Sequence, residues 1–162
     1  MIVATTDTSA VTNEWAMTEV IKHRVLRRIQ EELDSVVGPN RMVSESDLPH
    51  LNYLCCMIWD DVEDFRLERH WLANGSRVEI SQGADFKILP FSAGKRKCPG
   101  APLGVTLVLM ALARLFHCFD WAPLKGLKPE DIDTSEVYGM TMPKVEPLMA
   151  LARPRLPDYM YL

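Results

Sequence analysis

The residues with the clearest chemistry lie in the stretch FSAGKRKCPG, residues 91–100. Cys98 is the side chain there that can bind a metal through a thiolate. A thiolate stays ionised where positive charge and backbone N–H groups lie close to it, and the basic run 95–97 directly precedes this cysteine. Pro99 and Pro102 open a long apolar run, so the positive end of a helix would face the sulfur. The stretch therefore predicts a thiolate ligand, with a buried structural cysteine as the alternative.

Other residues of the same stretch suit a loop that approaches a flat ring system. Gly94 and Gly100 permit a tight turn and a close backbone approach, and Phe91 offers an apolar anchor. The stretch resembles the cytochrome P450 monooxygenases, because it fits their pattern Phe-x-x-Gly-x-Arg-x-Cys-x-Gly at every fixed position. The resemblance implies that Cys98 is the axial ligand of a haem iron. It also implies that Arg96 binds a haem propionate, and that Phe91, Gly94 and Gly100 shape the ligand loop.

A second chemical candidate lies near the N-terminus, in the sequence ATTDTS of residues 4–9. It resembles the oxygen-activating helix motif of the same family, with Asp7 and Thr8 at the matching positions and Thr5 where a small residue is usual. A hydroxyl beside a carboxylate within a helix can bind water and relay protons. The resemblance makes Asp7 and Thr8 the catalytic candidates, and a helix cap is the alternative interpretation.

The C-terminal segment carries the candidates for substrate contact. Residues 134–156 suggest a hairpin around Gly139. In the family this region points into the substrate pocket, so we expect the apolar side chains of the turn to contact substrate: Val137, Tyr138, Met140 and Met142. The strings EVYGMTMPK and FKILPFSAGKRKCPGAPLG resemble the plant branch that hydroxylates medium-chain fatty acids within the chain during pollen-wall formation. An apolar wall suits such a substrate.

The elements that must position these residues are mostly helices. Residues 1–38 have helical periodicity with a break at 22–24 and a Gly-Pro stop, and residues 101–119 form a helix that is apolar nearly all round. Residues 86–91 suggest a strand. We therefore expect a mainly α fold with a small β component, a truncated C-terminal part of the cytochrome P450 fold. Within one incomplete domain, residues 1–57 hold the oxygen-activating helix, and residues 58–162 hold the meander, ligand loop, buried helix and hairpin.

The chain departs from the family in its middle. After Met57 the sequence runs directly into IWDDVEDFRLERHW, which resembles a meander segment that lies tens of residues later in full-length members. The expected Glu-x-x-Arg helix is therefore missing, and the match at residues 63–66 is interpreted as coincidence. Arg69, which would close a buried Glu-Arg-Arg network, lacks its partners; an unpaired buried guanidinium is costly, so it is expected to be exposed or destabilising.

Composition excludes several other classes. The 162 residues carry a net charge of −4, which argues against a nucleic-acid surface, and the four cysteines show no spacing of a disulfide framework or zinc site. The longest uncharged apolar run, residues 101–113, is too short to cross a bilayer. With no signal or anchor visible, we expect this chain alone to be cytoplasmic. The resemblance places full-length relatives on the cytoplasmic face of the endoplasmic reticulum membrane.

Two functions from different classes remain open on the sequence. The resemblance implies a haem monooxygenase that takes electrons from a NADPH-dependent reductase and oxygenates an apolar small molecule. The alternative is a catalytically inactive haem-binding or unstable fragment of such an enzyme, because the Glu-x-x-Arg helix and much of the fold are missing.

Overall fold

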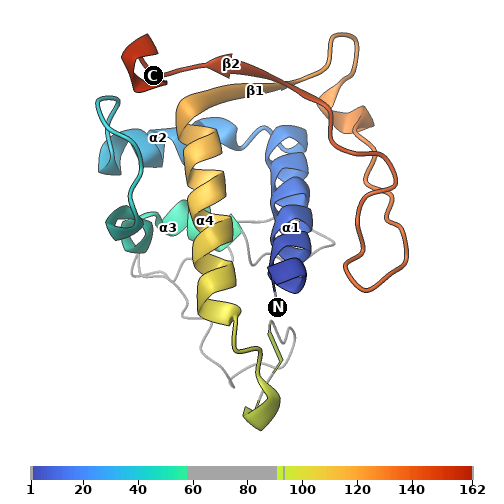
Figure 1. The fold of residues 1–162 in the computed structure, drawn as a ribbon. Helices are drawn as coiled ribbons and strands as arrows, with labels where there is room; N and C mark the ends of the chain where they lie inside the picture. The colour runs from blue at the N-terminus through green and yellow to red at the C-terminus, as the bar shows by residue number, and fades with distance from the viewer. Residues whose placement is uncertain (1, 58–90, 93, 162) are drawn as a thin grey trace, which may run out of the picture.

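The computed structural model describes residues 2–57, 91–92 and 94–161. Two long helices dominate it: α1 (Ile2–Lys22) and α4 (Ala101–Cys118). They pack side by side and both begin at the same end of the molecule (Figure 1). A two-stranded antiparallel sheet lies across their other end. The expected mainly α fold with a small β component is confirmed.

The predicted break after α1 is confirmed. The helix ends at Lys22, Arg24 takes a left-handed backbone conformation with φ 57°, and α2 (Leu26–Val36) follows. The apolar face of α2 points inward, with Ile29 and Leu33 fully buried. The opposite, charged face is exposed. The helix stop falls at Gly38, whose φ of 77° suits a residue without a Cβ.

Short helical turns connect α2 to the middle of the chain. A 3₁₀ helix, η1 (Glu45–His50), is followed by α3 (Asn52–Met57). The Asp47 carboxylate closes the start of η1, because it accepts hydrogen bonds from the Ser44 backbone N–H at 2.9 Å and the Ser44 hydroxyl at 2.7 Å. Arg41 donates two more to Asp47, at 2.6 and 2.8 Å. The Arg41 guanidinium and these bonds hold the pKa of Asp47 well below its usual range.

The sheet pairs β1 (Phe119–Pro123) with β2 (Ala150–Pro154). Their register sets Phe119 opposite Pro154 and Trp121 opposite Ala152. Between the strands lie η4 (Pro129–Asp131) and the hairpin predicted around Gly139, which closes at an isolated bridge between Glu136 and Lys144. After β2 the described chain ends in η5 (Asp158–Met160).

Helix α4 is the centre of the core. Its buried face meets α1, α2 and η1, and the fully buried side chains Leu112, Ala113 and Phe116 belong to one cluster with residues of all three. The helix continues beyond residue 113 to Cys118 and reaches a mean hydropathy of 1.6, so by length and composition it could cross a membrane. The uncharged run of residues 101–113 makes up the first part of this longer helix. Its packing in the core accounts for that composition.

His117 near the end of α4 is a packing residue. It is fully buried, and its Nε2 lies 3.0 Å from the Gly38 carbonyl oxygen. Burial lowers its pKa, so the ring is neutral and Nε2–H donates to that carbonyl. The contact joins α4 to the turn that follows α2.

Candidate functional site

The ligand loop begins with an unusual backbone. Phe91 and Ser92 both have positive φ, at 62° and 63°, a conformation that costs free energy for residues other than glycine. The Phe91 carbonyl accepts a hydrogen bond of 2.9 Å from the Cys98 N–H, which closes the loop. The Phe91 ring packs on α4, where a Cβ at Gly104 would lie 3.8 Å from its Cε1 atom. The loop is thus fastened at its start by both backbone and ring.

Cys98 is exposed and free, so the alternative of a buried structural cysteine is wrong. Gly100 lies beside it: a Cβ at this glycine would come within 3.8 Å of the Cys98 Sγ. Helix α4 begins immediately afterwards, with its first backbone N–H, that of Ala101, 3.4 Å from the Cys98 carbonyl oxygen. The sulfur therefore lies next to the positive end of a long helix, on a side left open by a glycine.

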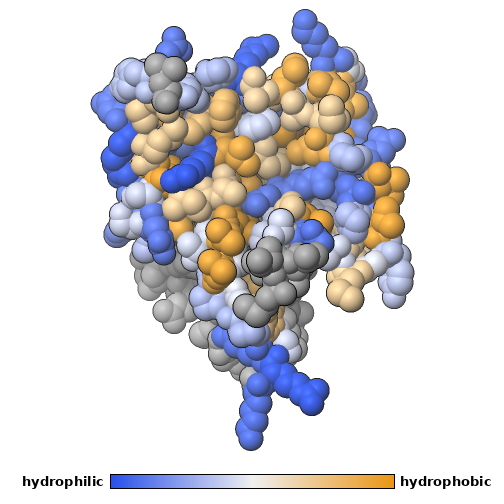
Figure 2. Space-filling model, viewed as in Figure 1, coloured by the Kyte–Doolittle hydropathy of each residue, from blue (hydrophilic) through white to orange (hydrophobic). Residues whose placement is uncertain are grey.

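Positive charge gathers at the same place. Gly94–Arg96 form a single 3₁₀ turn, η3, and Lys95, Arg96 and Lys97 are all exposed. Figure 2 shows long hydrophilic side chains projecting from the end of the molecule where Figure 1 draws η3. Within the described ranges no carboxylate lies at ion-pair distance from Arg96. Its guanidinium can donate hydrogen bonds to an external carboxylate such as a propionate.

The donor set of this loop fits a haem. The described residues contain no group of three His, Cys, Asp or Glu side chains that could hold a metal ion by themselves. A single free thiol beside cations suits a metal that brings its own in-plane ligands, as haem iron does. Cys98 would hold the iron and Arg96 would bind a propionate.

The second candidate segment lies on α1. Asp7 and Thr8 are exposed and lie inside the helix, which runs from Ile2, so they are not its cap. The Thr8 carbonyl accepts a hydrogen bond of 2.8 Å from the Thr12 hydroxyl. Because α1 and α4 begin at the same end, the structure brings Asp7 and Thr8 to the end of the molecule that carries the ligand loop (Figure 1).

The substrate-contact candidates form the tip of the hairpin. The Val137 N–H bonds the Pro143 carbonyl at 2.8 Å, and Tyr138 and Met140 are almost fully exposed beyond that bond. Met142 is also exposed and has a φ of 45°. Figure 2 shows apolar side chains at the edge of the molecule over this hairpin. Several sequence predictions lie outside the described residues: the match at residues 63–66, the exposure of Arg69, and the strand at 86–91 except for its last residue. That residue, Phe91, lies in a turn and not in a strand.

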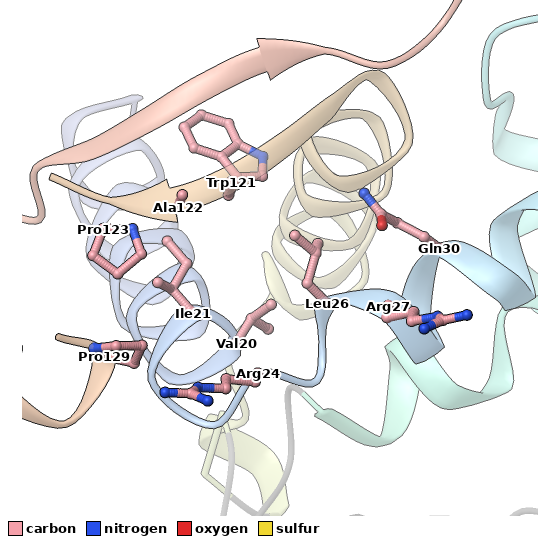
Figure 3. A pocket seen from close by; sticks show the side chains of 10 residues that line it. All are labelled: Val20, Ile21, Arg24, Leu26, Arg27, Gln30, Trp121, Ala122, Pro123 and Pro129. Atoms are coloured by element: carbon pink, nitrogen blue, oxygen red, sulfur yellow. The ribbon is translucent and has the colours of Figure 1, made fainter. Parts of the chain in front are cut away.

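A separate cavity of about 470 Å³ lies at the opposite end of the helices (Figure 3). Apolar side chains converge on it from α1, α2 and β1: Val20, Ile21, Leu26 and Trp121. Its two arginines already have partners, because Arg24 pairs with Glu130 at 3.0 Å and Arg27 pairs with Glu31 at 3.2 Å. The residues that line this cavity include no cysteine, serine, histidine or carboxylate.

The sequence did not predict two contacts that join distant parts of the chain. The buried Gln30 amide donates to the Phe116 and Phe119 carbonyls, both at 3.3 Å, and so caps the C-terminal end of α4. The Trp15 ring on α1 contacts the hairpin through the Met142 carbonyl. Neither contact leaves a local pattern, since the partners are distant along the chain. The only local signal for the Gln30 contact is that this polar residue lies on the apolar face of α2.

Comparison with known proteins places these observations in a family. The cytochrome P450 family profile matches residues 1–59 and 56–150. Cytochrome P450 703A2 of Arabidopsis thaliana and its namesake from Oryza sativa subsp. japonica are each 57% identical, over 99% of this chain and 40% of the relative. Flavonoid 3'-monooxygenase of Petunia hybrida is 32% identical over all of this chain and 41% of its own length.

The same comparisons describe the middle of the chain. This chain spans about 40% of the length of the curated relatives it matches. The Arabidopsis alignment extends over 211 residues, although the chain has 162, so the relative carries residues with no counterpart here. The family profile matches in two pieces that meet at residues 56–59. This is where the sequence predicts the missing segment.

Proposed function

This chain belongs to the cytochrome P450 family, and from that premise we propose that it carries the haem-binding and oxygen-activating parts of a monooxygenase. The observation that carries the proposal is Cys98, a free and exposed thiol between a basic turn and the start of α4. When bound, haem supplies the activation of O2 for insertion of one oxygen atom into a C–H bond.

In this proposal the residues of the chain have separate tasks. Cys98 would hold the iron, with the α4 N-terminus and three cations next to its sulfur. Arg96 orients the ring through a propionate. Thr8 and Asp7 hold water and move protons at the hydroxyl and carboxylate oxygens. The closed loop between Phe91 and Cys98 fixes the direction of the thiolate.

For the substrate we propose a medium-chain saturated fatty acid. The exposed side chains of the hairpin tip, Val137, Tyr138, Met140 and Met142, give an apolar surface suited to an alkyl chain. The identity to the two 703A2 proteins, 57%, is well above the 32% to the flavonoid 3'-monooxygenase. That difference favours the branch indicated by the hairpin and ligand-loop strings. Electrons would come from a NADPH-dependent reductase at the cytoplasmic face of the endoplasmic reticulum membrane.

A non-catalytic haem-binding or unstable fragment is the second candidate. The seam at residues 56–59, where the two matched pieces of the family profile meet, favours it, because the sequence runs there directly into a meander-like segment without the family's Glu-x-x-Arg helix. A chain without that helix could bind haem through Cys98 and still lack a competent catalytic pocket. Turnover of saturated fatty acids with reductase supplied separates the candidates, since only the first predicts a hydroxylated product.

The first test is the absorption spectrum of the haem-loaded, reduced chain under carbon monoxide. The unchanged chain should give the red-shifted Soret band of thiolate ligation. Cys98→Ala should lose that band and turnover, because no other thiol lies in the loop. Cys55→Ala is the matched control, since Cys55 is a buried core cysteine, and it should keep the band. An unchanged band in Cys98→Ala would refute the assignment.

A further inference from the structure

A set of contacts fastens the hairpin to α1 on one side of the molecule. The Trp15 Nε1–H donates a hydrogen bond of 3.1 Å to the Met142 carbonyl, and the Lys144 ammonium lies 4.9 Å from the centre of the Trp15 ring. One residue earlier on α1, the Glu14 carboxylate accepts a hydrogen bond of 2.8 Å from the Leu148 N–H. We call Trp15, Lys144 and the Met142 carbonyl the hairpin clamp.

The clamp contains two features that are costly unless they are held in place. Lys144 is only 6% exposed, and a buried ammonium needs partners. It finds them in the Asp133 carbonyl and the Trp15 ring. Met142, whose carbonyl Trp15 binds, has the left-handed φ of 45°, which is strained for a side chain of this type. A buried ammonium and a strained backbone are kept in a fold only where the surrounding contacts hold them in one geometry.

The position of Trp15 on α1 relates the clamp to the candidate catalytic residues. Trp15 follows Thr8 by seven residues, or two helical turns, so both lie on the same face of α1, about 10 Å apart along its axis. In Figure 1 the hairpin runs beside α1 towards the end where the helix begins. The clamp therefore fixes the apolar tip of the hairpin relative to the face that carries Thr8.

We propose that Trp15 is a positioning residue which, by holding the hairpin at Met142, decides which carbon of an apolar substrate is presented for oxygenation. The inference rests on the proposed monooxygenase function. It adds that specificity is determined by a side chain that does not touch the substrate. Loss of the Trp15 donor should release the hairpin tip without disturbing the ligand loop, which α4 holds.

The test compares two tryptophan variants that each lose one N–H donor. Trp15→Phe keeps an aromatic face for Lys144 but removes the bond to Met142. Trp121→Phe is the matched control, because Trp121 donates its own 3.0 Å bond to the Leu115 carbonyl, away from the hairpin. Amide hydrogen exchange is measured at Val137 and Val145, whose N–H groups close the hairpin against Pro143 and Ser135. Lys144→Met tests the clamp independently.

Trp15→Phe and Lys144→Met should each speed exchange at Val137 and Val145 about fivefold, the effect of losing one ordinary hydrogen bond or contact of that strength. Trp121→Phe should leave both amides unchanged. In the haem-loaded chain with reductase and a saturated medium-chain fatty acid, Trp15→Phe should change the ratio of hydroxylated positions. The carbon monoxide spectrum should stay the same.

Two outcomes would overturn the inference. Exchange in Trp15→Phe that equals exchange in Trp121→Phe would show that there is no clamp. Faster exchange with an unchanged product ratio would show that the clamp does not position substrate. If no variant forms product, including the unchanged chain, the monooxygenase proposal fails instead, and the exchange data alone then support or overturn the clamp.

Discussion

Cys98 and its neighbours show how single residues prepare the site. The thiol is exposed, yet the backbone that carries it is fixed by the 2.9 Å bond between Cys98 N–H and the Phe91 carbonyl. Gly100 adds no atoms beside the sulfur, where a Cβ would reach 3.8 Å from Sγ. A ligand that must meet a flat ring system needs this combination of fixed direction and open approach.

Thr8 is the residue whose change should separate haem binding from catalysis. Thr8→Ala should leave the carbon monoxide spectrum intact, because Thr8 lies on α1 and not in the ligand loop. The variant should release reducing equivalents as hydrogen peroxide and lower product yield about 100-fold or more, because proton delivery is lost. Asp7→Asn should act in the same direction.

Thr12→Ala is the matched control for this prediction, since it removes an exposed hydroxyl one turn later on the same helix. Product yield per NADPH and peroxide release are measured together. If the Thr8 and Thr12 variants gave the same product yield per NADPH and the same peroxide release, the proposed role of Thr8 in proton delivery would be contradicted.

His117 should make stability depend on pH. Burial lowers its folded-state pKa below the ordinary value of 6.5, so the unfolded chain binds a proton more readily. The free energy of unfolding should therefore fall as pH drops below 6.5. His117→Gln keeps a donor for the Gly38 carbonyl and should flatten this part of the dependence. The measurement is urea unfolding at a series of pH values. His50→Gln, at an exposed site, is the control and should retain the fall in unfolding free energy below pH 6.5. The same pH dependence in both variants would rule the prediction out.

At the scale of elements, η1 depends on one carboxylate. Asp47→Asn should destabilise the chain at neutral pH by about 1.5–3 kcal/mol, the range for hydrogen bonds to a charged group. Because the folded-state pKa of Asp47 is lowered, this stabilisation is present above the unfolded value of 3.8 and is lost as pH falls below it. The difference between the two proteins in urea unfolding should shrink in acid. Glu45→Gln, on the exposed side of η1, should behave like the unchanged chain.

The helices could be predicted from sequence because their signals are local. Helical periodicity predicted α1 and α2, a long apolar run predicted α4, and the Gly-Pro stop predicted the end of α2. The hairpin was predictable from its turn at Gly139, whereas the role of the ligand loop stays a prediction. The pairing of β1 with β2 was not, since Phe119 and Pro154 are far apart along the chain. The Gln30 and Trp15 contacts depend on the same long-range packing.

At the scale of the whole molecule, the two sides of the seam share one core. Val20 of α1, Ile29 of α2 and Leu54 of α3 belong to the same buried cluster as Leu112 of α4. The helices before Met57 therefore need α4, which begins only at Ala101, to complete their hydrophobic core. We infer that the described parts of this chain unfold together as one cooperative unit.

Leu112→Ala tests that inference. Leu112 is fully buried at the meeting point of the helices, so its truncation should cost about 2–5 kcal/mol, a large part of the stability of a typical domain. Leu107→Ala, on the same helix at 45% exposure, should cost no more than about 0.5 kcal/mol. Far-UV circular dichroism and tryptophan fluorescence should follow one transition in each protein, shifted to lower urea only for Leu112→Ala. Two separate transitions would mean that the helices before the seam and α4 are stabilised independently, and that the shared core does not join them.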